Sequence, residues 1–113
     1  MTYKEEMIQI NEKIKFAEEQ GKPVSKMLYI KQIELLEKAH TEFIETAAKK
    51  GYDLNTNLDI LETEIRQFTA MSQLAKKIGI STEKYEKYIK DARIRVYGKE
   101  CTEQIFYSQN NKL

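Results

Sequence analysis

Residues 71–96, MSQLAKKIGISTEKYEKYIKDARIRV, carry a helical apolar pattern on each side of a single glycine. Glycine readily adopts the positive φ angle that ends many helices, so Gly79 is the natural end of the first pattern. Ser81 or Thr82 can then accept hydrogen bonds from the free N–H groups of a second helix. The stretch therefore predicts two helices joined by a tight turn. The apolar face of the second helix contains Tyr85, Tyr88, Ile89, Ala92 and Val96.

The rest of the chain repeats this arrangement toward the N-terminus. Apolar residues recur at intervals of three and four in two earlier segments, separated by EEQGKPVS and YDLNTN, which is the periodicity of amphipathic helices. Helices are predicted near residues 3–19, 24–50, 56–78 and 82–97. The expected core consists of Ile10, Ile14, Ile33, Leu36, Phe43, Leu61, Ile65, Phe68, Leu74 and Ile78.

Length and composition favour one all-α domain, a small bundle of four main helices. The chain has 113 residues, of which 33% are charged and 41% hydrophobic, with four glycines and one proline. Such scarcity of glycine and proline favours long helices over a sheet with many turns. Residues 1–51 should form an antiparallel helical hairpin, because two amphipathic helices are joined by a short link. Residues 52–97 should form a second helical unit, and residues 98–113 a tail.

The tail allows two structures. CTEQIFY suits a short final helix, whereas RIRVY and EQIFY could pair as a hairpin across Gly98 and Lys99, since both contain β-branched and aromatic residues. The helix is favoured for residues 98–107.

Several classes of protein are not expected. No apolar run approaches the roughly 20 residues that span a bilayer, and the acidic N-terminal stretch is unlike a signal peptide. The single cysteine, Cys101, cannot form an internal disulfide, which favours a reducing, cytoplasmic location. No glycine-rich phosphate loop or nucleophile elbow is present, so neither an enzyme nor a cofactor is predicted.

Glu37 and His40 form a Glu-x-x-His pair on one helical face, a spacing found in di-iron helical bundles. Such sites need further carboxylates and a second motif, and this chain has one histidine. A histidine that packs at the edge of an apolar stripe is the favoured interpretation, and no metal site is predicted.

Residues 71–96 resemble the helix-turn-helix motif of bacterial and phage regulators. Ala75 occupies the position where that motif needs a small residue, and Gly79 occupies its turn. The buried positions are matched by Leu74, Ile78 and Ile80. The resemblance implies a small regulatory protein that binds double-stranded DNA.

The charge distribution agrees with DNA binding. Residues 70–100 contain eight Lys or Arg against four Asp or Glu, whereas residues 1–69 contain ten against thirteen. A basic module beside an acidic one suits docking on phosphate. Glu83 and Glu86 would nevertheless face the polyanion, and the front of that helix has no Arg, Asn or Gln to read bases. The predicted DNA contacts are Ser81, Thr82, Lys84, Lys87, Lys90 and Arg93.

A helical protein-interaction module is the alternative, for example a phage-type inhibitor of a host protein. Tyr85, Tyr88 and Tyr97 would then be the contact residues, because tyrosine is enriched at protein interfaces. The abundance of Lys, Ile, Asn and Tyr is typical of a low-GC bacterium or its phage. A homodimer through the apolar face of residues 3–19 is also expected.

Overall fold

Four helices in the order α1 to α4 make up most of the described chain. The computed structural model describes residues 2–98 and contains no strand in that range, which confirms the all-α prediction. The helices are α1 (Tyr3–Glu19), α2 (Lys26–Lys49), α3 (Leu58–Lys77) and α4 (Glu83–Tyr97). None of them carries an apolar stretch long enough to cross a lipid bilayer. The choice between helix and hairpin for residues 98–107 falls outside the described residues, apart from Gly98.

Three of the four helices end in the same way. The glycine that follows the helix has a positive φ, which is 78° at Gly79, and the next amide reaches back to an alanine carbonyl one turn earlier, as in a Schellman motif. These bonds run from Lys22 to Ala17, from Tyr52 to Ala47 and from Ile80 to Ala75. Each alanine stands four residues before its glycine. Ala-x-x-x-Gly therefore marks the ends of α1, α2 and α3.

The start of α3 differs from the sequence prediction, which began this helix near residue 56. The side chain of Asn57 accepts the capping hydrogen bond, from the amide of Ile60 at 3.2 Å. Asn55 is instead held in a turn, because its amide donates to Oδ1 of Asp53 at 2.9 Å. These turn bonds delay the helix by two residues.

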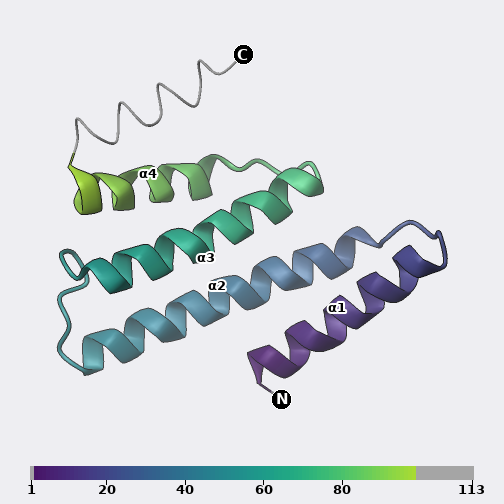
Figure 1. Cartoon of the computed structure of the whole chain (residues 1–113), viewed down its shortest axis with the longest axis horizontal. Helices are drawn as coiled ribbons and strands as arrows, with labels where there is room; N and C mark the ends of the chain where they lie inside the picture. The colour runs from purple at the N-terminus through teal and green to yellow at the C-terminus, as the bar shows by residue number, and fades with distance from the viewer. Residues whose placement is uncertain (1, 99–113) are drawn as a thin grey trace, which may run out of the picture.

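The helices follow one another as a row of antiparallel neighbours (Figure 1). Each helix packs on the next one in the chain, and no Cα atom of α1 lies within 8 Å of one in α3 or α4. The Cα extents of 47 × 44 × 19 Å reflect this flat arrangement. The predicted N-terminal hairpin of α1 and α2 is confirmed. Because α1 packs on α2 but not on α3, the surface of α3 that faces α1 is left partly uncovered.

The flat arrangement also changes the predicted core. Four of the ten expected residues are buried, and the other six are half-buried because a row of helices covers them on one side only. The buried four are Ile10, Ile33, Leu61 and Ile78. The half-buried six are Ile14, Leu36, Phe43, Ile65, Phe68 and Leu74. The core also contains Tyr29, Met71, Ala75 and Tyr85, which were not on the predicted list.

Two leucines near the start of α3 test this burial pattern. Leu61 is 0% exposed and Leu58 is 54% exposed. Leu61→Ala should lower the free energy of unfolding by about 2–5 kcal/mol, because a buried leucine loses its contacts and leaves a cavity. Urea denaturation followed by circular dichroism measures the change. Leu58→Ala is the matched control and should shift stability by about 0.5 kcal/mol or less. Equal losses for the two variants would contradict the packing of α3.

Candidate functional site

A buried carboxylate on α3 joins three helices. Glu64 is 2% exposed, and its Oε2 atom accepts a hydrogen bond from the hydroxyl of Tyr88 on α4. Nε2 of His40 on α2 lies 2.8 Å from the same oxygen, so the imidazole donates when its proton is on Nε2. Burying a carboxylate is unfavourable unless it is paired and hydrogen-bonded. These two partners therefore tie α2 and α4 to α3.

Aromatic rings enclose this carboxylate. The ring of Phe68 stacks on that of Tyr88, with centroids 4.0 Å apart. The ring of His40 meets Phe68 edge-on at 4.8 Å, and Tyr85 lies 6.2 Å from Phe68. We call His40, Glu64, Phe68, Tyr85 and Tyr88 the polar–aromatic cluster. Burial raises the pKa of the Tyr88 hydroxyl, and the hydrogen bond to Glu64 raises it further.

Glu37 makes a second link between α2 and α4. Its Oε1 accepts from the hydroxyl of Tyr85 at 3.0 Å and from Nζ of Lys84 at 3.3 Å. The hydrogen bond to Glu37 raises the pKa of Lys84, and burial followed by the bond to Glu37 raises that of Tyr85. Together with the cluster, this link holds α4 against one side of the α2–α3 pair.

Glu37 and His40, one turn apart on α2, contact different partners. Glu37 turns to α4, and His40 turns to Glu64. Within residues 2–98, no group of three or more His, Cys, Asp or Glu side chains is placed to hold a metal ion. The spacing in this chain thus serves contacts between helices.

Of the residues predicted to contact DNA, Lys84, Lys87 and Lys90 border one pocket on α4, and Ser81, Thr82 and Arg93 are not among the described residues that line it. Lys87 and Lys90 are exposed on α4, whereas Lys84 is directed to Glu37. Oγ of Ser81 accepts from the amide of the first helical residue at 3.3 Å. Thr82 and Arg93 are half-buried. Two carboxylates, Glu83 and Glu86, also lie in the first turn of α4, where a phosphate would need to approach.

The α3–α4 unit is an antiparallel hairpin. α4 runs back along α3 (Figure 1), so that Tyr88 reaches Glu64, 24 positions earlier. In helix-turn-helix motifs the two helices cross at roughly 90–120°. The Ala75–Gly79 pattern that carried the resemblance also recurs at two other helix ends. In this chain, Ala-x-x-x-Gly is therefore primarily a pattern that ends helices.

The three tyrosines predicted to contact a partner have different environments. Tyr85 is 4% exposed, so it belongs to the core and is unavailable to a partner. Tyr88 is half-buried within the polar–aromatic cluster. Tyr97, at the end of α4, is exposed.

An apolar groove of about 360 Å³ lies between α1, α2 and α3. Its lining residues are Met7 from α1, Gln32 and Leu36 from α2, and Ala70, Gln73, Leu74 and Lys77 from α3. Nε2 of Gln32 donates to Oδ1 of Asn11 on α1 at 2.6 Å. Nζ of Lys77 lies 4.9 Å from the centre of the Tyr29 ring. We call this surface the open groove.

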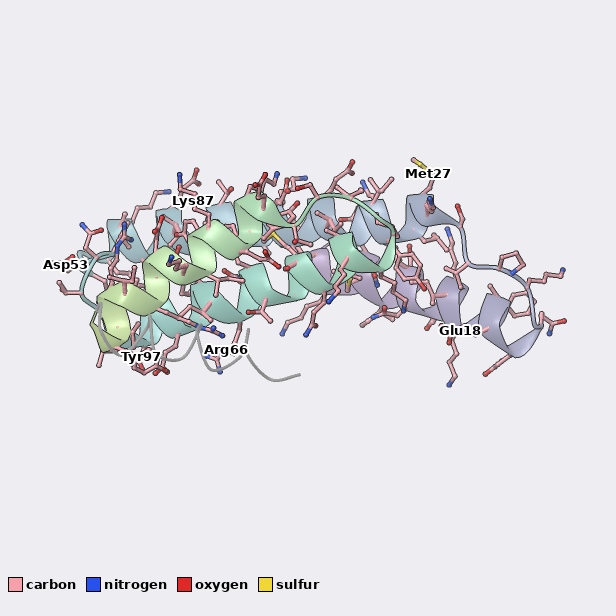
Figure 2. All side chains as sticks on the ribbon, turned by 90° about the horizontal axis from the view of Figure 1, so that it is seen from above. Glu18, Met27, Asp53, Arg66, Lys87 and Tyr97 are labelled. Carbon is pink, nitrogen blue, oxygen red and sulfur yellow. The ribbon has the colours of Figure 1, made fainter. Side chains whose placement is uncertain are left out.

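The open groove and α4 lie on different sides of the α2–α3 pair. Leu36 lines the groove and the next residue, Glu37, contacts α4, and consecutive residues project about 100° apart around a helix. Figure 2 shows Arg66 and Lys87 on opposite faces of the molecule. Arg66 stands one turn before the groove residue Ala70. The α2–α3 pair is thus covered by α4 on one side and is open on the other.

Local sequence patterns do not predict this groove. Leu36 and Leu74 were assigned to the core because they continue the apolar stripes of their helices. Their partial exposure follows from the separation of α1 and α3, which no local pattern reports.

Tyr88→Phe tests the polar–aromatic cluster. Losing the hydroxyl leaves Glu64 with fewer hydrogen bonds, so the free energy of unfolding should fall by about 1–3 kcal/mol at neutral pH. The raised pKa of Tyr88 stabilises the folded chain below the unfolded tyrosine value of about 10, and this contribution is lost as the pH rises through the folded pKa. The difference between wild type and variant should therefore shrink above about pH 10.

Denaturation at a series of pH values measures this difference. Tyr52→Phe, which changes an exposed tyrosine, should have an effect of about 0.5 kcal/mol or less at every pH. A Tyr88→Phe variant as stable as wild type at neutral pH would show that Tyr88 does not hold Glu64.

Comparison with protein-family models, with curated proteins and with solved structures finds no match for this chain. The functional proposal therefore rests on the geometry of the chain itself.

Proposed function

We propose that this chain is a helical protein-interaction module that binds one amphipathic helix of a partner protein in the open groove. The observation that carries the proposal is the unequal cover of the α2–α3 pair. α4 covers one side through the polar–aromatic cluster. The other side leaves Met7, Leu36 and Leu74 in an apolar groove that crosses three helices.

The groove has the features of a helix-binding site. An amphipathic helix places apolar residues at every third and fourth position, and such a row fits into a groove between parallel or antiparallel helices. Gln32 and Gln73 add polar groups beside the apolar lining, and a few polar groups of this kind fix the orientation of a ligand.

An inhibitor that docks on a host protein, the alternative role considered from the sequence, would use such a site. A cytoplasmic location, predicted from the single cysteine, suits this role. The predicted homodimer through α1 stays a prediction, and sedimentation of the purified chain tests it.

A synthetic amphipathic helix tests the groove directly. The probe is a peptide of about 18 residues, or five helical turns, with leucines along one face and glutamine and alanine elsewhere. Titrated into the isotope-labelled full chain, it should shift the NMR signals of Leu36, Ala70 and Leu74. Leu74→Asp should abolish these shifts, because a charge in an apolar contact remains unpaired when the peptide binds.

Met27→Asp is the matched control. Met27 is 68% exposed and projects from the face that carries Lys87 (Figure 2), so this variant should bind the peptide like wild type. Shifts confined to α4, or no shifts at all, would overturn the proposal.

Binding to double-stranded DNA through α4 is the second candidate function. Lys87 and Lys90 are exposed on an edge helix, and residues 70–98 contain seven Lys or Arg against three Asp or Glu. This excess of positive charge on one helical unit favours contact with phosphate. The paired Lys84 and the buried Tyr85 limit the contact to the outer side of α4.

A double charge reversal tests the second candidate. If α4 binds DNA, the wild-type chain should bind a mixed-sequence duplex at low ionic strength with an affinity that falls steeply with salt. Lys87→Glu with Lys90→Glu should abolish this binding and leave helicity unchanged. Lys13→Glu with Lys22→Glu makes the same change of net charge away from α4 and should retain most of it. Fluorescence anisotropy measures both. Absence of salt-sensitive binding by wild type would refute DNA binding.

A further inference from the structure

We infer that the helix bound in the open groove carries acidic residues on both flanks of its apolar face. This inference rests on the proposed function and specifies the chemistry of the partner. The groove has an apolar floor, and positively charged side chains border it on both sides.

The border on α1 is formed by Lys4 and Lys15. Lys4 lies three residues before the groove residue Met7, and Lys15 lies four residues after Asn11, whose side chain bonds Gln32 of the groove. Residues three or four apart are neighbours on a helix surface. Both lysines are exposed, so their ammonium groups are available along this edge.

The border on α3 is formed by Arg66 and Lys77. Lys77 lines the groove itself, and its Nζ lies 4.9 Å from the centre of the Tyr29 ring, a contact that favours one position of the cation. Arg66 is exposed and lies four residues before Ala70, on the face that Figure 2 shows opposite Lys87. The two borders therefore carry two cations each.

Carboxylates are few along the same edges. Residues 66–77 of α3 contain no Asp or Glu, and Glu62 lies one turn before Arg66. On α1, Lys4 and Lys15 lie within about 80° of Met7 around the helix, whereas Glu5, Glu6 and Glu12 lie about 100° or more away. Glu18 lies within about 20° of Met7, but about three turns further along the helix. The groove residues of α2, Gln32 and Leu36, are uncharged. Cations therefore outnumber carboxylates along the groove, an arrangement that repels a helix with lysines on its flanks and attracts one with glutamates.

Three peptides that differ only on their flanks test the inference. Each has the leucine face described above, and the flanking positions are all Glu, all Gln or all Lys. With the full chain at about 50 mM salt, the Glu peptide should bind most tightly and the Lys peptide most weakly. Exposed charge pairs are individually weak, so four of them should give about a tenfold or larger ratio of dissociation constants. At about 500 mM salt the three values should converge because the charges are screened.

Charge reversal on the chain provides the reciprocal test. Arg66→Glu with Lys77→Glu should weaken the Glu peptide and strengthen the Lys peptide, with circular dichroism used to confirm folding. Lys87→Glu with Lys90→Glu makes the same charge change on the opposite face and should leave the order of the three peptides unchanged.

The outcomes separate the two proposals. If the Gln peptide binds but all three dissociation constants agree at low salt, the acidic-helix inference fails and the helix-binding function stands. If no peptide binds, the proposed function fails. If the chain forms a dimer that Leu36→Asp converts to monomer, a second copy occupies the groove and the inference is overturned.

Discussion

The carboxylate of Glu64 is the constraint on which the packing of α4 depends. A charge removed from water needs partners, and the partners here come from two other helices, His40 on α2 and Tyr88 on α4. The contact fixes the position of α4 along α3 as well as its side of the α2–α3 pair, because the Tyr88 hydroxyl must meet one particular oxygen. Stacking between Phe68 and Tyr88 adds apolar contact at the same point. Polar and aromatic contacts therefore act on the same helix position.

The open groove results from the same arrangement of the four helices. With α4 committed to one side and α1 attached to α2 alone, nothing among residues 2–98 fills the space between α1 and α3. A flat row of four helices buries less apolar surface than a closed bundle, and six predicted core residues remain half-buried as a result. The same geometry that limits the core leaves an apolar groove open between α1 and α3.

Local features of the sequence were enough to predict the helices but not their packing. Periodicity and glycine positions located all four, since helix ends depend on nearby residues such as Ala75 and Gly79. Glu64 is a different case, because a glutamate on an amphipathic helix is usually solvated and no spacing reveals a partner 24 positions away. The sequence pairs His40 with Glu37, but in the structure the carboxylate that His40 contacts is that of Glu64. The groove depends on the distance between α1 and α3, which are separated by the whole of α2.

One side of the α2–α3 pair is filled by α4, and the other side is open to solvent. A soluble paramagnetic relaxation agent, added to the methyl-labelled full chain, tests it most directly. The methyl signals of Leu36 and Leu74 should be attenuated, while those of Leu35 and Leu61, which are 2% and 0% exposed, should be protected. The contrast between Leu35 and Leu36 is the most informative, because the two residues are adjacent in sequence. Equal protection of all four leucines would contradict the account, since it would mean that the groove is closed.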